Sequence, residues 1–386
     1  MTVLTALKLP ANSYLEPVQD DVIMGARCGL ALTYPAHSGP EIIMTVAPNS
    51  HHRPIAYWLL SVCALVFAMV VLGGVTRLTG SGLSMVEWEP IVGTVPPLST
   101  TEWQETYHKY QQTPEYQKKN LGMSLEEFKG IFWFEYAHRL LGRSIGIAFL
   151  LPFLYFLFKE WIEKPMVPKL ITMFLLGGLQ GVLGWYMVAS GLVDNPHVSQ
   201  YRLTAHLAAA FLIYAYMFWV ALGLLYPQRE TGTELRSLRR FVHLVAGMIA
   251  VTVLSGGFVA GLKAGFAYNT FPLMDGHWLP PAYGLLEPAW KNIFENIPAV
   301  QFNHRWLALS SLALVIVLWL RSRTYVLPSR ARRGFNLLLT MAVLQVALGI
   351  STLLLLVPTP LASAHQAGAL VLFTLTLYTL HALRLR

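Results

Sequence analysis

Four histidines occupy matched places in the most apolar parts of this 386-residue chain, at His138, His206, His304 and His365. Each lies within about two helical turns of the same end of a hydrophobic run, so all four reach a similar depth. Facing side chains in a helical bundle are a common way to hold a metal cofactor, and histidine is the usual axial ligand of haem iron. The pattern therefore predicts two haem sites, each with a pair of histidines.

Zinc or copper is disfavoured at these pairs, because no further histidine, cysteine or acid completes either site. A lone histidine in a membrane span is more often a hydrogen-bonded packing residue. Packing alone does not explain four histidines at matched depth. We therefore interpret these residues as ligands of haem iron.

An acid distinguishes the two predicted sites. Glu135 precedes His138 by three residues, and the equivalent position before His304 is Gln301. Residues three apart share one face of a helix. A carboxylate inside a membrane span is costly, whereas an amide cannot ionise. We expect proton-coupled chemistry at the first site and electron transfer at the second; the alternative is that Glu135 only pairs with an arginine such as Arg139.

Four arginines lie at the same ends of the apolar runs as the histidines, at Arg77, Arg139, Arg202 and Arg305. Haem propionates need cationic partners near a polar boundary. These arginines are therefore candidates for propionate binding. The alternative for each is a side chain that extends toward the membrane interface without binding haem.

The composition places these residues in a polytopic membrane protein. The chain is 55% hydrophobic and 12% charged, about half the charged fraction of soluble domains. The net charge of +8 does not indicate nucleic-acid binding, because the basic residues lie in short loops between apolar runs. An all-α fold with eight transmembrane helices is predicted, at about 56–77, 132–158, 168–190, 201–226, 240–262, 300–320, 334–357 and 362–383.

The loop charges predict the orientation. Lysines and arginines cluster in the loops after the second, fourth and sixth runs, whereas 191–200 and 358–361 contain neither. By the positive-inside rule both termini are cytoplasmic, and the histidines lie toward the outer side. Two long loops, 78–131 and 263–299, then face that outer side as well, where short helices can cap the bundle.

An internal repeat is visible in the sequence. Gly73-Gly74 matches Gly256-Gly257, and His138-Arg139 matches His304-Arg305. Four spans in each half insert the same way up, so we expect two parallel four-helix bundles. The predicted regions are a disordered cytoplasmic tail at 1–52, a substrate half at 53–226 and a cofactor half at 227–386.

Several motifs together resemble the haem A synthase family over about residues 54–383. They are Gly-Gly-Val-Thr-Arg-Leu-Thr-Gly-Ser-Gly-Leu-Ser at 73–84, Glu-Tyr-Ala-His-Arg-Leu-Leu-Gly-Arg at 135–143, Tyr-Arg-Leu-Thr-Ala-His-Leu at 201–207, Tyr-Asn-Thr-Phe-Pro-Leu-Met-Asp-Gly at 268–276, Asn-His-Arg at 303–305 and Ala-His-Gln at 364–366. Some members carry a cysteine pair in the first long loop. Residues 78–131 contain no cysteine, so the chain resembles the cysteine-free proteobacterial and mitochondrial class.

The resemblance implies an activity that composition alone does not. The family oxidises the ring C8 methyl of haem O to a formyl group, giving haem A for cytochrome oxidase. By the family's pattern, His304 and His365 hold a haem b cofactor, His138 and His206 hold the substrate haem, and Glu135 is the catalytic acid.

The implied location is a bacterial inner membrane, with the haem sites toward the periplasm and membrane lipid around the helices. The implied partners are a haem O synthase and cytochrome oxidase assembly, and a homo-oligomer is one expected assembly. Two other classes compete. A dihaem b-type electron-transfer protein usually places one haem near each membrane face, and a transporter predicts a polar site at mid-membrane.

Overall fold

The computed structural model describes residues 51–87, 95–191, 198–227 and 235–384. Pro48–Arg386 forms one compact unit. The tail predicted at 1–52 falls almost wholly outside the described residues, so that prediction is not tested.

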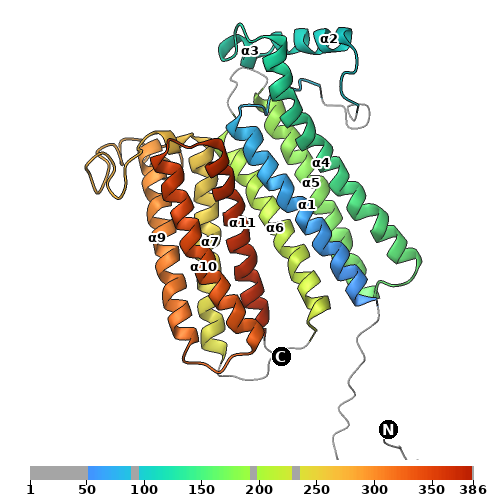
Figure 1. Cartoon of the computed structure of the whole chain (residues 1–386), viewed down its shortest axis with the longest axis vertical. Helices are drawn as coiled ribbons and strands as arrows, with labels where there is room; N and C mark the ends of the chain where they lie inside the picture. Colours follow the sequence, from blue (N-terminus) through green and yellow to red (C-terminus); the bar gives the residue numbers. More distant parts are fainter. Residues whose placement is uncertain (1–50, 88–94, 192–197, 228–234, 385–386) are drawn as a thin grey trace, which may run out of the picture. The chain divides into compact units, whose positions relative to one another are not determined.

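Eight helices among the described residues are long and apolar enough to cross a membrane, as predicted. They are drawn in Figure 1 as α1 (His52–Leu78), α4 (Leu125–Phe158), α5 (Val167–Gly191), α6 (Gln200–Leu225), α7 (Leu235–Gly261), α9 (Ile297–Ser322), α10 (Ser329–Leu354) and α11 (Thr359–Ala382). The shortest, α11, has 24 residues. That length extends about 36 Å at 1.5 Å per residue, more than the roughly 30 Å of a bilayer core.

The described residues confirm the all-α prediction. β-structure within them is limited to an isolated bridge between Met274 and His277. Large apolar side chains such as Leu151, Leu175 and Val317 are exposed on the long helices. Exposed apolar surface of this kind is expected where helices face hydrocarbon, so the chain has the features of a multi-pass membrane protein.

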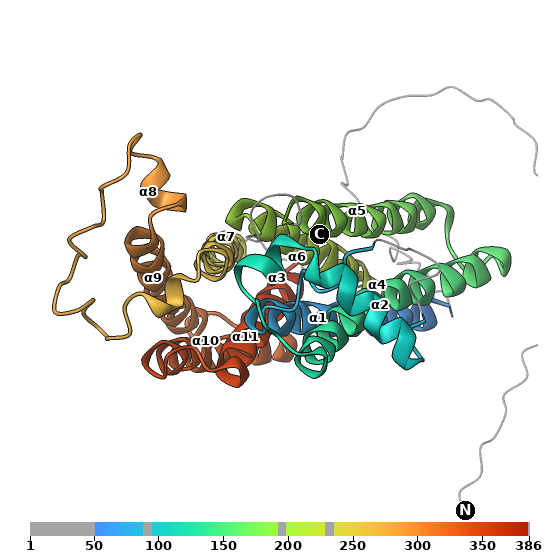
Figure 2. The same ribbon diagram turned by 90° about the horizontal axis from the view of Figure 1, so that it is seen from above.

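Helix packing follows the order of the chain. In the first group, α1 contacts α4 and α6, and α5 contacts the same two helices. In the second group, α7 and α10 both contact α9, and α11 contacts α10 and α7. The groups join where α6 meets α7 and where α11 meets α1 and α6, as Figures 1 and 2 show. The predicted repeat and its boundary at 226/227 stay predictions.

The two long loops lie at one end of the bundle, which we call the long-loop end. The first contains α2 (Thr100–Gln111) and α3 (Pro114–Lys118), and the second contains a 3-10 turn (Ala264–Phe266) and α8 (Lys291–Phe294). Aromatic packing of Tyr110 against Phe128 fastens the first loop to α4. The long loops therefore cap the same end of the bundle with short helices.

Candidate active site

The four predicted histidines lie on four different helices in the part of the bundle nearest the long loops. His138 is on α4, His206 on α6, His304 on α9 and His365 on α11. His206, His304 and His365 each lie about two turns after the first residue of the helix. His138 lies farther along α4, because that helix begins at Leu125 and extends beyond the predicted span into the first long loop.

Each of these imidazoles packs against a glycine on a neighbouring helix. A Cβ built on each glycine would lie 2.8–3.4 Å from the histidine ring. The four contacts join Gly73 with His138, Gly184 with His206, Gly256 with His304, and Gly349 with His365. A larger residue at any of these positions would displace the ring, so the glycines leave the space that the imidazoles occupy.

His304 and His365 face one another. Their ring centroids are 6.5 Å apart and their planes are nearly perpendicular, at 88°. An imidazole nitrogen binds a transition metal at about 2 Å, so two rings on opposite sides of one metal have centroids about 6 Å apart. The separation therefore fits a single iron atom between the two rings, and this pair fits the axial ligands of a haem.

A serine fixes the tautomer of His304. Ser255 Oγ lies 2.7 Å from His304 Nδ1 and donates its own proton to the Thr252 carbonyl at 2.7 Å. Because that hydroxyl has one proton, it can only accept from His304 Nδ1. The proton of His304 is then on Nδ1, which leaves the Nε2 lone pair free to bind a metal.

His206 and His365 share another contact. Gln180 donates to the His206 carbonyl at 2.9 Å, and Gln345 donates to the His365 carbonyl at 2.8 Å. The ring nitrogens differ, because Gln345 Nε2 also lies 3.2 Å from His365 Nδ1, whereas His206 Nδ1 is buried without a partner. Both rings of the His304–His365 pair thus have a polar neighbour at Nδ1, which His206 lacks.

Metal binding by side chains alone is not supported. The described residues contain no group of three or more His, Cys, Asp or Glu side chains that could hold a metal ion. Two imidazoles in each half remain as donors. This donor set fits a tetrapyrrole that supplies the other ligands itself, rather than a bare zinc or copper ion.

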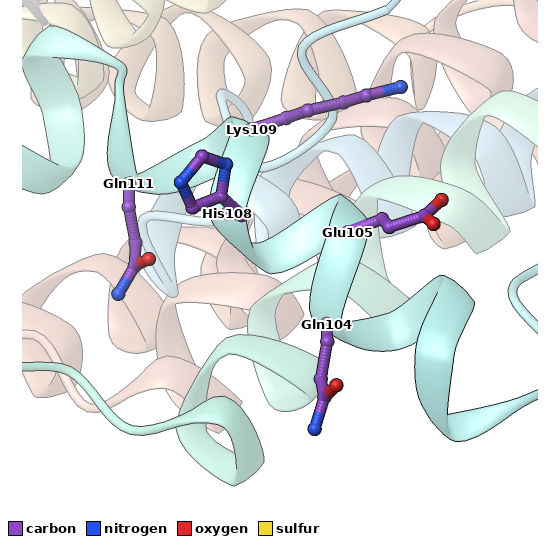
Figure 3. Close-up of a pocket in the computed structure, with 5 residues that line it drawn as sticks. All are labelled: Gln104, Glu105, His108, Lys109 and Gln111. Carbon is purple, nitrogen blue, oxygen red and sulfur yellow. The ribbon is translucent and has the colours of Figure 1, made fainter.

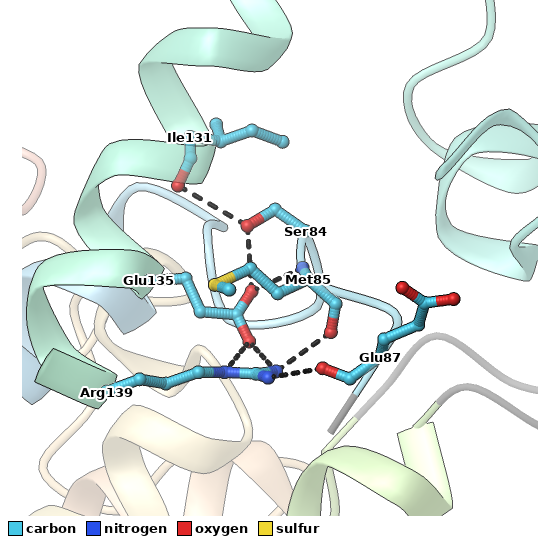
Figure 4. A network of polar contacts seen from close by, with 6 residues as sticks. All are labelled: Ser84, Met85, Glu87, Ile131, Glu135 and Arg139. Atoms are coloured by element: carbon cyan, nitrogen blue, oxygen red, sulfur yellow. Dashed lines mark hydrogen bonds and ion pairs between the residues drawn. The ribbon is translucent and has the colours of Figure 1, made fainter. Parts of the chain in front are cut away.

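Glu135 is buried, with 2% of its surface exposed, and four donors hold its carboxylate. Ser84 Oγ and the Met85 amide donate to Oε2 at 2.7 and 2.9 Å. Arg139 donates to Oε1 from Nε at 3.1 Å and from an Nη at 2.5 Å, and Figure 4 shows all four contacts. A carboxylate has about four lone-pair positions, so these donors fill them.

Arg139 also binds the loop beyond α1. Its Nη atoms donate to the Met85 and Glu87 carbonyls at 2.8 and 2.9 Å. Glu135 and Arg139 therefore clip residues 84–87 to α4, one helical turn from His138. The pairing of Glu135 with an arginine is thus present, and the proposed propionate role of Arg139 stays a prediction.

Gln301 and Arg305 form the corresponding clip in the second group of helices. Gln301 Nε2 donates to the Tyr268 carbonyl at 3.0 Å. Arg305 donates to the carbonyls of Tyr268 and Thr270 at 2.8 and 2.7 Å. The amide thus performs the same anchoring as the carboxylate, which means that anchoring alone does not require an acid at residue 135.

The other predicted propionate residues have their own contacts. Arg77 donates to the Gly261 carbonyl at 2.9 Å, which ties the end of α1 to the end of α7, and its Nε is buried without a partner. Arg202 lies over the ring of Tyr186, 4.9 Å from the centroid. Their role toward propionates stays a prediction.

Comparison with known proteins identifies the family of the chain. The sequence matches the COX15-CtaA family, described as cytochrome oxidase assembly protein, over residues 56–377. It is 62% identical over 334 residues to "Heme A synthase" of Nitrosospira multiformis, covering 86% of this chain and 94% of that protein. The chain belongs to the haem A synthase family. It is also 47% identical over 349 residues to "Heme A synthase COX15" of Bos taurus, covering 88% and 84% of the two chains.

Within this haem A synthase family member, a hollow on α2 lies apart from the histidines. Figure 3 shows its side chains pointing in different directions from one exposed helix, and it is lined by Gln104, Glu105, His108, Lys109 and Gln111. None of the predicted site residues lines it. We assign it no function.

Sequence reasoning assigned no role to three polar residues that bear on the site. Ser255 precedes the Gly256-Gly257 pair, Gln366 follows His365, and Glu115 lies in the first long loop. The Ser255 contact requires knowledge of how α7 packs on α9, and that packing is not readable from spacing. The one available signal was position, because Ser255 and Gln366 are sequence neighbours of residues already singled out.

Proposed function

We propose that this protein is a haem A synthase that oxidises the ring C8 methyl of haem O to the formyl group of haem A. The observation that carries the proposal is the 62% identity to a Heme A synthase across 94% of that protein's length. The reaction consumes one water per methyl and releases four protons and four electrons. An electron acceptor beyond this chain must therefore take the four electrons.

The two histidine pairs bind different haems in this proposal. We assign the substrate haem to His138 and His206, and a permanent haem b to His304 and His365. When bound, haem b supplies a one-electron carrier between the substrate site and the acceptor. The Ser255 hydrogen bond at His304 supports this assignment, because a resident cofactor benefits from a ligand whose tautomer and orientation are fixed. His206 lacks such a partner at Nδ1, as suits a haem that must enter and leave.

Glu135 is the proposed catalytic residue at the substrate pair. It lies one turn from His138 on the same face of α4. Glu135 could act as a proton acceptor or as a fixed negative charge. Its four donors disfavour the first role, because a proton would displace one of their hydrogen bonds. A fixed negative charge can stabilise positive charge that develops on the porphyrin. We therefore assign Glu135 the electrostatic role.

The proposed location is a bacterial inner membrane with both termini in the cytoplasm. The basic residues in the loops opposite the long-loop end support this orientation. The haem sites then face the periplasm. A haem O synthase supplies the substrate, assembly of cytochrome oxidase consumes the product, and lipid surrounds the exposed apolar helix faces.

Pigment analysis of the purified protein tests the proposal. Haem b together with haem O or haem A in the extract supports it. Haem b alone would instead support a dihaem electron-transfer protein, and no haem at all would overturn both assignments. The same extraction from a strain that lacks haem O synthase is the control, since haem b should remain while haem O and haem A disappear.

A further inference from the structure

Glu115 is a buried acid in the first long loop that the proposed function leaves without a role. It lies on α3 with 5% of its surface exposed, and its Oε2 is buried without a hydrogen-bond partner. Buried carboxylate oxygens are normally hydrogen-bonded, so an unpartnered one needs an explanation. The exposed acids on the neighbouring helix α2, such as Glu105, have no such need.

The surroundings of Glu115 connect four parts of the fold. The charged groups within electrostatic range are Lys119 at the end of its own helix, Glu135 on α4, Arg77 at the end of α1 and Lys263 just beyond α7. Arg77 itself reaches across to the Gly261 carbonyl of α7. Glu115 is thus beside the junction between the two groups of helices, on the side of the substrate pair.

Glu115 and Glu135 differ in their capacity to take a proton. All four lone-pair positions of Glu135 are occupied by donors, so protonation there breaks a hydrogen bond. Glu115 Oε2 accepts none, so a proton can bind there without loss of a hydrogen bond. Glu115 thus has an open acceptor position on a buried oxygen, whereas both oxygens of Glu135 are occupied by donors.

The pKa of Glu115 lies close to neutral pH. Burial raises the pKa of Glu115 to about 7, and the charge of Glu135 also raises it, while Lys119, Arg77 and Lys263 act in the opposite direction. A group with a pKa near the working pH is present in both forms and can therefore bind and release protons repeatedly. Glu115 meets this condition at neutral pH.

Residues 79–84, which follow Arg77 and reach Glu135, carry hydroxyl groups that can donate and accept protons. Thr79 Oγ1 and Ser81 Oγ are 2.6 Å apart, and Ser84 Oγ donates to Glu135 at 2.7 Å. Ser81 and Ser84 are fully buried. A hydroxyl both donates and accepts, so each of these groups can take part in proton transfer.

We propose that Glu115 is the proton-exit residue of the enzyme, accepting protons released during oxidation of the haem methyl and passing them to water at the long-loop end. This inference rests on the proposed function. In each transfer an O–H bond forms at Glu115 Oε2 and then breaks as the proton leaves to water. The electrons do not pass through Glu115; they go to the electron acceptor of the overall reaction.

The pH dependence of haem A formation by Glu115→Gln tests the inference. Ionised Glu115 is the accepting form, so the wild-type rate should rise as the pH increases through about 7. Glu115→Gln should lose this rise and be slower by about 10²-fold at pH 8, a typical loss for a proton-transfer group. Glu115→Asp, which keeps a carboxyl group, should recover most of the rate with a shifted midpoint.

Two controls separate this role from a structural one. Glu105→Gln changes an exposed acid on the adjacent helix and should keep the wild-type profile. The low-spin haem b spectrum should be unchanged in every variant, since Glu115 is not a ligand. If Glu115→Gln fails to hold haem b, the profile of Glu115→Asp decides, because an unshifted midpoint overturns the inference and a shifted one supports it.

The possible failures are distinguishable. A Glu115→Gln protein with the wild-type rate and pH profile would falsify the proton-exit role and leave the proposed function intact. A wild-type protein that makes no haem A at any pH overturns the proposed function itself. A uniform loss of rate in Glu115→Gln, with the pH dependence retained, also rejects proton exit and indicates a packing role.

Discussion

Gln366 on α11 donates a hydrogen bond from Nε2 to the carbonyl of Val70 on α1, at 2.7 Å. Its amide lies against Gly74, where a Cβ would be 2.6 Å from the Gln366 Cδ. Gln366 directly follows His365, and Gly74 directly follows Gly73, which packs on His138. This contact therefore joins the surroundings of the two histidine pairs across the junction between the helix groups.

Gly74→Ala should loosen that junction. The new methyl group would force the half-buried Gln366 side chain away and break its bond to Val70. We expect a loss of about 1–3 kcal/mol in stability, measured as a lower melting temperature of the purified protein in detergent. Gly247→Ala on α7 is the matched control, because a Cβ there meets nothing within 4 Å. Equal effects of the two substitutions would contradict the assignment.

The transmembrane helices could be predicted from the sequence because long apolar runs leave few alternatives. The start of α4 could not, because its first turns are polar and depend on a capping box between Ser124 and Glu127. This capping box lies outside the apolar run, which begins near residue 132. The same kind of box, between Ser99 and Glu102, begins α2 in a loop where hydropathy predicts no helix.

The candidate site was predictable only in part. The depth of the four histidines follows from their places in the apolar runs, and the observed pairing of His304 with His365 agrees with it. The sequence offers the pair of Glu135 and Arg139 only as an alternative, because a separation of four residues allows the pair without showing which loop it anchors. The contacts of Ser255 and Gln366 depend on which helices are neighbours, and periodicity does not contain that information.

Glu135→Gln should retain bound haem yet stop short of haem A, with haem O or a hydroxylated intermediate accumulating. The fold should tolerate the change, because Gln301 already forms the same clip with Arg305 in the second group. The loss should be chemical, since an amide carries no charge to stabilise the transition state. Haem types in the extract, resolved by chromatography, measure the outcome.

The reciprocal variant Gln301→Glu is the control for that experiment. It adds an acid beside His304 without removing one from the substrate pair, so haem A should still form. A wild-type yield of haem A from Glu135→Gln would remove the catalytic role of Glu135. Loss of all haem from Glu135→Gln would instead show that the carboxylate is needed for binding.

Ser255→Ala should weaken haem b binding without abolishing it. The substitution removes the acceptor of the His304 Nδ1 proton while both imidazoles remain. Loss of a hydrogen bond behind a metal ligand typically reduces affinity by about 10–100-fold. Titration of haem into haem-depleted protein, followed by the low-spin absorption spectrum, gives the affinity directly.

Two further variants serve as controls for Ser255→Ala. His304→Ala should lose the low-spin spectrum entirely while the protein still inserts. Ser144→Ala, which changes an exposed serine bonded only within its own helix, should bind haem b like wild type. If Ser255→Ala binds haem b with wild-type affinity, the tautomer of His304 is set by another contact.

Glu115 should also make stability depend on pH in a specific direction. An unfolded glutamate has a pKa of about 4.3, and burial raises the pKa of Glu115 to about 7 in the folded protein. Between those values the folded state holds a proton that the unfolded chain has lost, so stability falls as the pH rises. Glu115→Gln cannot lose a proton and should escape this fall. Its melting temperature should match wild type near pH 5 and exceed it at pH 8, whereas Glu105→Gln should follow wild type throughout. A Glu115→Gln protein that melts below wild type at pH 8 would show instead that Arg77, Lys119 and Lys263 stabilise the ionised carboxylate by more than its burial costs.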